Sequence, residues 1–298
     1  MQHCTIGDTK LSVSPICLGT MGFGKPISES DAARVVHWAL DNGINFLDTA
    51  DMYEGYDRYI GSPGGVGERV LGKALEGRRE RAVVTTKVGS DVGGKGLSRK
   101  HVLRQIDASL GRLRTDHVDL YLMHRPDPDT PLAESIAVMN ELIEAGKTRH
   151  WGFSNFEAAQ IEEMVRLCDA GGWPRPVVSQ PPCSWLKRDA EAEHLPACRR
   201  HGIAATPYQP LQGGLLTGKY RRGEPLPQGS RASEKPQWLA VADELHGRLE
   251  AFAAEARAGG LTPAQYAVRW VLDRPGVASV VVGCKRSEQL ADLLPAAG

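Results

Sequence analysis

The sequence lacks the features of nucleic-acid-binding and membrane-spanning proteins. Its 298 residues include 36 lysines plus arginines and 36 aspartates plus glutamates, and no long basic run interrupts this balance. Without an excess of positive charge, we expect no nucleic-acid partner. No apolar run approaches the roughly 20 residues that a membrane-spanning helix needs, so we expect no membrane partner.

Cysteine is scarce and shows no metal-binding pattern. The chain has six cysteines, none of them in a CxxC pair, so we expect neither a metal centre nor a disulfide framework. Reduced thiols of this kind are typical of the cytosol. The first residues also lack a basic segment followed by an apolar core, so we expect no signal peptide and a cytoplasmic location.

Two glycine motifs fall short of a nucleotide-binding loop. GERVLGKA (67–74) ends in Ala74, where a phosphate loop requires the hydroxyl of serine or threonine. The glycines at 65 and 67 have no third glycine of the dinucleotide fingerprint and no apolar strand before them. The sequence therefore predicts neither a P-loop nor a Rossmann βαβ unit.

What the chain does have is a regular alternation of strand-like and helical segments. After an N-terminal hairpin, we predict strands at 16–19, 44–50, 82–88, 118–124, 148–154, 176–180, 203–208 and 277–283. We predict helices at about 29–42, 67–75, 98–114, 131–146, 157–171, 191–202, 237–258, 262–273 and 287–294, the first capped by Ser28 or Ser30 and ended by Gly43. Eight such units predict an α/β fold of the (β/α)8 TIM-barrel type, with a long Gly- and Pro-rich loop (211–236) after the seventh strand. No change in composition divides the chain, so we expect residues 1–298 to form a single domain.

Four ionisable residues lie at or just beyond the ends of three predicted strands. Asp48 belongs to INFLDTA (44–50), Lys87 to AVVTTKV (82–88), and His124 ends VDLYLMH (118–124). Tyr53 follows Asp48 on the next loop. Active sites of TIM barrels lie at the carboxyl ends of the strands, so these four side chains predict a proton-transfer site.

The lysine and the aspartate are expected to pair. Each would be costly to bury alone inside a barrel, whereas together they compensate one another. The phenol of Tyr53 ordinarily titrates near roughly 10. An ammonium group beside it stabilises the phenolate, so we predict that Lys87 lowers the pKa of Tyr53 and makes it a usable acid or base.

With these four residues and the motifs around them, the chain resembles the aldo-keto reductase family. The matching motifs follow the family's order and spacing over nearly the whole chain: INFLDTADMY (44–53), TTKVG (85–89), LYLMHRPDP (120–128), GFSNF (152–156), VSQ (178–180) and PYQPLQGGLLTGKY (207–220). The resemblance implies NADP(H) bound at the carboxyl ends of the strands and a small-molecule carbonyl substrate. Tyr53 would then be the general acid, Lys87 would depress its pKa, Asp48 would hold Lys87, and His124 would orient the carbonyl oxygen.

The same resemblance implies the cofactor-binding residues. Ser154, Asn155 and Gln180 would bind the nicotinamide carboxamide, and Tyr208 would stack on the ring. The residues Leu211, Gly213, Leu215, Thr217 and Lys219 would line the pyrophosphate, and Gly283, Cys284, Lys285, Arg286 and Gln289 would surround the adenosine 2′-phosphate. The remaining implied contacts are Gly19, Thr20, Met21, Asp48, Gln209 and Pro210. A lysine and an arginine opposite a phosphate favour NADP(H) over NAD(H).

Three other functions stay open. One remains an enzyme of this kind but changes the direction or the substrate, for example oxidation of a sugar alcohol or aldose, or reduction of a keto-sugar intermediate. A lysine at a strand end could be the nucleophile of a Schiff-base aldolase, although Asp48 beside Lys87 would raise the pKa that such chemistry needs to be low. Relatives with the same four residues also serve as non-catalytic subunits or redox sensors. The chain could be a monomer or a homo-oligomer. The long loop 54–66 should lie beside the substrate pocket, where Tyr56, Arg58 and Tyr59 could contact substrate.

Overall fold

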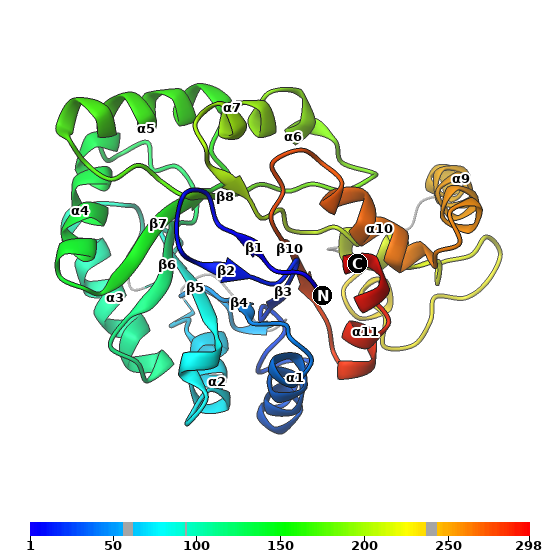
Figure 1. The fold of residues 1–298 in the computed structure, drawn as a ribbon. Coiled ribbons are helices and arrows are strands. Elements are labelled where there is room, and N and C mark those ends of the chain that lie inside the picture. Colours follow the sequence, from blue (N-terminus) through cyan, green and yellow to red (C-terminus); the bar gives the residue numbers. More distant parts are fainter. Residues whose placement is uncertain (56–61, 93, 237–242) are drawn as a thin grey trace.

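Eight parallel strands form one curved sheet in the order β10-β3-β4-β5-β6-β7-β8-β9. The computed structural model describes residues 1–55, 62–92, 94–236 and 243–298 (Figure 1). The strands of the sheet are β3 (Ile16–Gly19), β4 (Phe46–Asp48), β5 (Val83–Val88), β6 (Val118–Met123), β7 (Thr148–Ser154), β8 (Val178–Gln180), β9 (Ala204–Ala205) and β10 (Val280–Gly283). Each strand therefore lies beside its neighbours in the chain, as successive right-handed β-α-β units require.

The sheet closes through backbone contacts between the segments that contain β9 and β10. The N–H of Ala205 donates to the carbonyl of Gly276 at 2.9 Å, and the N–H of Ala278 donates to Ala205 at 2.9 Å. Further along, the N–H of Val281 donates to Pro207 at 2.8 Å. The predicted (β/α)8 barrel is thereby confirmed.

Helices surround the barrel on its outside (Figure 1). They are α1 (Glu29–Asp41), α2 (Val66–Ala74), α3 (Arg99–Leu113), α4 (Leu132–Glu144), α5 (Ala158–Gly171), α6 (Asp189–Ala192), α7 (His194–Arg200), α8 (Arg231–Glu234), α9 (Asp243–Ala258), α10 (Pro263–Leu272) and α11 (Ser287–Ala291), with 3-10 turns η2 (Arg79–Arg81), η3 (Gln212–Thr217) and η4 (Leu294–Ala297). The predicted start of α1 is confirmed, because the Ser28 hydroxyl accepts from the N–H of Asp31 at 3.1 Å.

Several predicted elements differ from the structure, and the strands expected at 203–208 and 277–283 shorten to β9 and β10. The strand expected at 44–50 shrinks to β4, because its partner β3 ends at Gly19 opposite Asp48. The helix expected at 191–202 is split into α6 and α7 by the non-helical backbone of Glu193. The loop expected at 211–236 contains η3 and α8. Tyr56, Arg58 and Tyr59, and the first part of the helix expected at 237–258, lie outside the described residues.

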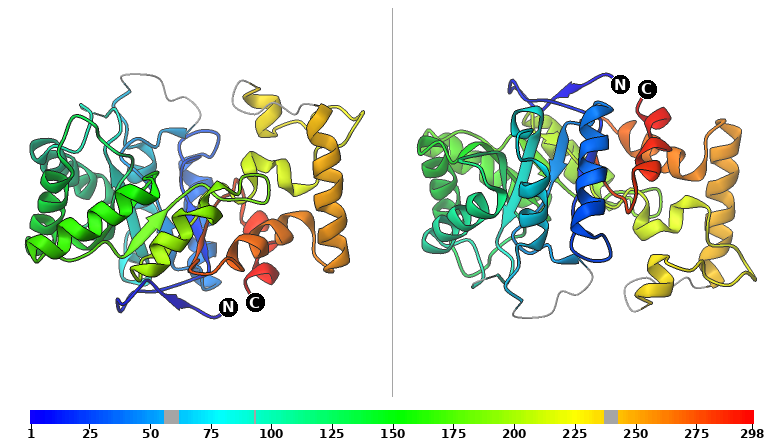
Figure 2. Two further views of the ribbon diagram at one scale, coloured as in Figure 1. Left: turned by 90° about the horizontal axis from the view of Figure 1, so that it is seen from above. Right: turned by 90° about the horizontal axis from the view of Figure 1, so that it is seen from below.

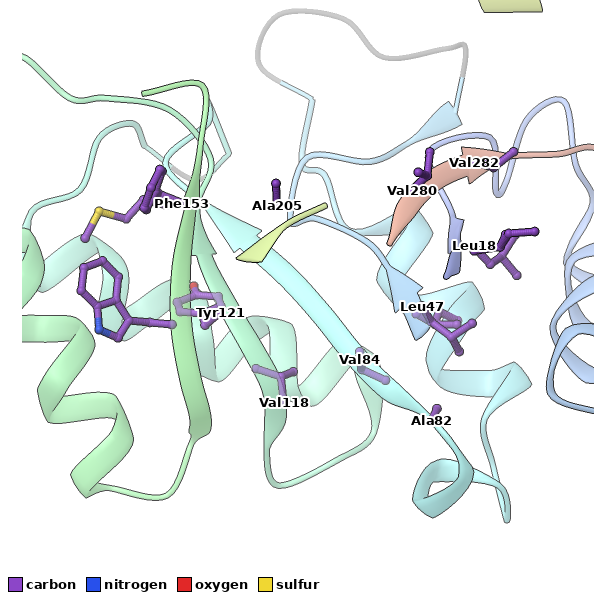
Figure 3. Packing of buried hydrophobic residues seen from close by; sticks show 14 of the residues in the cluster. Leu18, Leu47, Ala82, Val84, Val118, Tyr121, Phe153, Ala205, Val280 and Val282 are labelled. Atoms are coloured by element: carbon purple, nitrogen blue, oxygen red, sulfur yellow. The ribbon is translucent and has the colours of Figure 1, made fainter. Parts of the chain in front are cut away.

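The barrel has an apolar interior and an apolar outer layer. Inside, Phe46, Leu120 and Leu122 pack with residues of the N-terminal hairpin, whose strands are β1 (Cys4–Thr5) and β2 (Ser12–Val13). Outside, side chains such as Leu47 and Tyr121 fill the space between the strands and the helices (Figure 3). The alternation of these two faces along each strand fixes which side chains point into the barrel.

The two ends of the barrel carry different structures. The hairpin covers one end, and the segment that contains α8 lies at the other (Figure 2). Because the hairpin packs on the interior near the beginnings of the strands, the opposite end is the one at which the strands terminate. In the described part of the chain, no helix has the length and apolarity to cross a membrane. All six cysteines are free thiols.

Candidate active site

Three of the four predicted residues form one hydrogen-bonded cluster at the carboxyl ends of β4 and β5. The ammonium of Lys87 donates to Asp48 Oδ2 at 2.6 Å, to the Thr49 carbonyl at 2.8 Å and to the Tyr53 hydroxyl at 3.2 Å. Lys87 is fully buried and Asp48 is 1% exposed. The predicted ion pair is therefore present, and it has a tyrosine as its third member.

The second oxygen of Asp48 also has a partner. The side-chain amide of Gln180, at the end of β8, donates to Asp48 Oδ1 at 2.9 Å. The Asp48 carboxylate is thus held from both sides, by Lys87 and by Gln180. This contact links the predicted nicotinamide site to the proton-transfer cluster, and nothing in the sequence signals it, because the two residues are 132 positions apart.

His124 faces the phenol of Tyr53. It follows β6 directly, and its ring meets the Tyr53 ring edge-on, with centroids 6.0 Å apart and an interplanar angle of 76°. Its Nδ1 lies 3.4 Å from the hydroxyl of Ser90. The phenol and the imidazole therefore border the same space, into which a carbonyl oxygen could approach both.

The electrostatics of the cluster agree with one prediction and correct another. Burial lowers the pKa of Lys87, but the Asp48 carboxylate and the Tyr53 phenol outweigh it and hold this pKa above its ordinary value. Burial raises the pKa of Tyr53 and outweighs the lowering effect of Lys87. The prediction that Lys87 brings the pKa of Tyr53 down is therefore wrong in its net direction, because desolvation disfavours the phenolate more strongly.

The raised pKa of Lys87 also bears on the aldolase alternative. A Schiff-base nucleophile needs a neutral amine with a free lone pair. Lys87 instead donates three hydrogen bonds from a fully buried position. These contacts argue against Lys87 as a nucleophile.

A large pocket opens above this cluster, with a volume of about 890 Å³. Most of the residues predicted for catalysis and cofactor binding lie on its walls: Gly19, Met21, Asp48, Tyr53, His124, Ser154, Asn155, Gln180, Tyr208, Gln209, Pro210, Leu211, Gly213, Thr217, Lys219, Gly283, Cys284, Lys285 and Gln289. Four predicted residues do not line it: Thr20, Lys87, Leu215 and Arg286. Lys87 lies beneath the floor, where it contacts Tyr53 and Asp48.

The residues predicted for the nicotinamide carboxamide form a network of their own. The Tyr208 hydroxyl donates to Asn155 Oδ1 at 2.8 Å, and Asn155 Nδ2 donates to the His124 carbonyl at 2.9 Å. The Ser154 hydroxyl donates to the Gln180 carbonyl at 2.6 Å. Asn155 also has a positive φ of 63°, a costly conformation that functional sites often retain. These hydrogen bonds connect the ends of β6, β7 and β8 with the segment that follows β9 along this part of the pocket wall.

The residues predicted for the pyrophosphate follow β9 on a strongly turned segment. Gly213 and Gly214 have positive φ values of 66° and 101°. Backbone of this kind favours glycine, because other residues rarely adopt such positive φ values. Leu215, predicted to line the phosphate, instead packs with Leu216 in a separate apolar cluster, because the 3-10 turn directs it away from the pocket.

At the predicted 2′-phosphate end, Lys285 already has partners. Its ammonium donates to Glu234 at 2.8 Å and to the Gly229 carbonyl at 2.9 Å. Arg286 is exposed and is the N-cap residue that precedes α11. Thr20 is fully buried, and its hydroxyl has no hydrogen-bond partner among the described residues.

Sequence reasoning missed several other residues on the pocket wall: Gly22, Pro26, Ile27, Met52, Arg125, Pro126, Gly214, Gly229, Arg231, Val281 and Val282. Arg125 could have been found, because it directly follows a predicted site residue at a strand end. Pro26 and Ile27 could not, since they lie further along the loop after β3 than the predicted contacts Thr20 and Met21, and no sequence pattern indicates that this part of the loop returns to the pocket.

Fold and site together define a class of protein: a (β/α)8 barrel with a buried lysine–aspartate pair and a tyrosine at the carboxyl ends of its strands. Comparison with known proteins identifies the family. The profile described as "Aldo/keto reductase family" matches residues 15–297. The chain belongs to this family of oxidoreductases.

Relatives with curated names are similar along nearly their whole length. A "Probable voltage-gated potassium channel subunit beta" from Arabidopsis thaliana is 34% identical, over 99% of this chain and 91% of that protein. The "Uncharacterized oxidoreductase YrpG" of Bacillus subtilis is 35% identical, with the same two shares. A "Putative voltage-gated potassium channel subunit beta" from Schizosaccharomyces pombe is 35% identical over 96% of this chain and 85% of that protein.

Proposed function

We propose that this protein is an NADP(H)-dependent oxidoreductase that interconverts a carbonyl group and an alcohol, with Tyr53 as the general acid. The observation that carries the proposal is the contact of the Tyr53 hydroxyl with Lys87, which is itself paired with Asp48 under a large pocket. The reducible group would be an aldehyde, a ketone or a keto-sugar.

The pocket residues fit a phosphorylated dinucleotide. Ser154, Asn155 and Gln180 would hold the carboxamide of the nicotinamide, and the ring of Tyr208 would pack on it. Backbone and ammonium groups near Gly214 and Lys219 offer donors for a pyrophosphate, since both residues line the pocket. Lys285 and Arg286 carry the positive charge that a 2′-phosphate requires. Lys285 would bind the phosphate in addition to the Glu234 carboxylate that it already binds.

When bound, the reduced cofactor supplies a hydride to the carbonyl carbon. The Tyr53 hydroxyl donates its proton to the carbonyl oxygen as negative charge develops there, and His124 orients that oxygen from the opposite side. Lys87 keeps the Tyr53 oxygen in place and stabilises the phenolate that remains. Asp48 keeps Lys87 charged, and Gln180 keeps Asp48 in position.

The raised pKa of Tyr53 suits the reducing direction. A phenol whose pKa lies above its ordinary value is fully protonated near neutral pH and is available as an acid. The six free thiols fit a reducing compartment, and we therefore propose that the protein acts in the cytoplasm.

Titration of NADPH and NADH into the purified protein, followed by tryptophan fluorescence, tests the cofactor assignment. Oxidation of NADPH with small aldehydes and ketones then tests the reaction. Tight NADPH binding with carbonyl-dependent turnover supports the proposal. Failure of both nucleotides to bind would refute it at its first step.

The names of the channel-subunit relatives favour one second candidate, a cofactor-binding subunit or redox sensor with little turnover. The two candidates differ in rate. An enzyme turns over many times per minute with a suitable carbonyl compound. A sensor oxidises its bound nucleotide about once and then releases the product slowly, so stopped-flow and steady-state rates measured on one sample separate the two candidates.

A further inference from the structure

Arg125 is a cation on the pocket wall that has no acidic partner among the described residues. It directly follows His124, is exposed and lines the same pocket as Tyr53. Its guanidinium donates to the Ser90 hydroxyl at 3.4 Å, and in the described part of the chain it forms no ion pair. By contrast, Arg112 binds the buried carboxylate of Glu68 at 2.6 Å. Four of the five donors of Arg125 are therefore left for water or a ligand.

The charge of Arg125 acts inside the pocket. Burial raises the pKa of Tyr208, whereas Lys87 and Arg125 oppose that shift. The hydroxyl of Ser90, which is 1% exposed, lies 3.4 Å from both Arg125 Nη2 and His124 Nδ1. Arg125 thus presents polar hydrogens beside the imidazole that would orient the carbonyl oxygen, while the buried Ser90, which does not line the pocket, accepts a hydrogen bond from Arg125.

The phosphates of the cofactor would be bound by basic residues other than Arg125. The other basic residues on the described pocket wall are Lys219, Arg231 and Lys285, and all three belong to segments after β9 and β10, where the phosphates would lie. Asp48 is the acidic residue on that wall, and Lys87 neutralises it. The end of the pocket near Tyr53 therefore carries a net positive charge that comes from Arg125.

We propose that Arg125, positioned by its hydrogen bond to Ser90, binds a carboxylate on the substrate, so that the preferred substrates are carbonyl compounds that also carry an acid group. A guanidinium binds a carboxylate through two parallel hydrogen bonds, which gives both affinity and a defined direction. The apolar side chains of Met21 and Ile27 on the same wall suit the carbon skeleton that separates the two groups. This assignment rests on the proposed carbonyl reduction and names its substrate class.

A matched pair of substrates tests it. 4-Carboxybenzaldehyde and its amide, 4-formylbenzamide, have nearly the same shape and differ in charge. The corresponding 3-substituted pair tests whether the preference depends on the position of the acid group relative to the aldehyde. The wild type should prefer the acid in kcat/KM. Arg125→Ala should lower the acid-to-amide ratio by about 10- to 100-fold, mainly through KM, because one charge-assisted contact is lost. Arg125→Lys should keep part of the preference, since it retains the charge.

The control is Arg257→Ala, which removes an exposed arginine of α9 that does not line the pocket. It should leave the ratio at the wild-type value. Equal use of acid and amide by the wild type, or an unchanged ratio in Arg125→Ala, would overturn the assignment while leaving carbonyl reduction intact. Absence of turnover with every aldehyde, despite NADPH binding, would instead refute the proposed function, and this assignment with it.

Discussion

The buried pair of Lys87 and Asp48 makes Asp48→Ala the most informative change for stability. Both side chains are almost completely inaccessible, at 0% and 2% exposure, and their charged atoms are 2.6 Å apart. Removal of the carboxylate leaves an ammonium in the barrel with two neutral acceptors, the Thr49 carbonyl and the Tyr53 hydroxyl. It also removes the acceptor of the Gln180 amide.

The expected loss follows from these contacts. Breaking a buried ion pair on one side costs about 3 to 5 kcal/mol. The two remaining acceptors of Lys87 favour the lower part of that range, and the lost Gln180 hydrogen bond adds about 1 kcal/mol. We therefore expect Asp48→Ala to lower the free energy of unfolding by about 4 kcal/mol at neutral pH.

The contribution of Lys87 to the pH dependence of stability should have opposite signs in the wild type and in Asp48→Ala. In the wild type the pKa of Lys87 is raised, so its stabilising contribution is complete below the ordinary value of 10.5 and is lost only at higher pH. In Asp48→Ala, burial acts without the carboxylate and lowers that pKa. The unfolded chain then binds the extra proton, so stability rises with pH, by up to about 1.4 kcal/mol per unit below 10.5.

Urea unfolding at pH 7 and pH 9, each compared with the wild type, measures both effects. Asp48→Ala with Lys87→Met should recover most of the loss and remove the extra pH dependence, because no unpaired charge remains. Asp107→Ala, which breaks the exposed pair with Lys147, should cost less than about 1 kcal/mol. An Asp48→Ala protein whose stability, and whose change of stability between pH 7 and pH 9, equal those of the wild type would refute the reasoning.

Two further predictions concern the cofactor and the acid. Lys285→Ala combined with Arg286→Ala should weaken NADPH binding about 10- to 100-fold more than NADH binding, as measured by fluorescence titration; equal losses would remove the 2′-phosphate assignment. Since the pKa of Tyr53 is raised, carbonyl reduction should be nearly independent of pH from about 6 to about 9 and decline only in alkali. A decline near neutral pH in the kcat profile would show that another group supplies the proton.

The sequence predicts the barrel and the central cluster because both follow from simple periodicities. Apolar strands ending in polar residues identify the carboxyl ends of the barrel, and the cost of an isolated buried charge pairs Lys87 with Asp48. These inferences need only local patterns and one general energetic rule.

Other features depend on three-dimensional detail that no local pattern contains. The pKa of Tyr53 is the balance of burial against the charge of Lys87, and the depth of burial appears only in the folded protein. Leu215 packs into an apolar cluster because Gly213 and Gly214 turn the backbone before it. The contact of Gln180 with Asp48 joins residues from opposite parts of the chain.

The most direct test of the account is the rate of hydride transfer in Tyr53→Phe, measured by stopped flow with saturating NADPH and an aldehyde. Loss of the proton donor should slow the step about 100- to 10,000-fold. NADPH affinity should stay within about twofold of the wild type, because the hydroxyl acts mainly in the transition state. A Tyr53→Phe protein that transfers hydride at the wild-type rate would contradict the central claim.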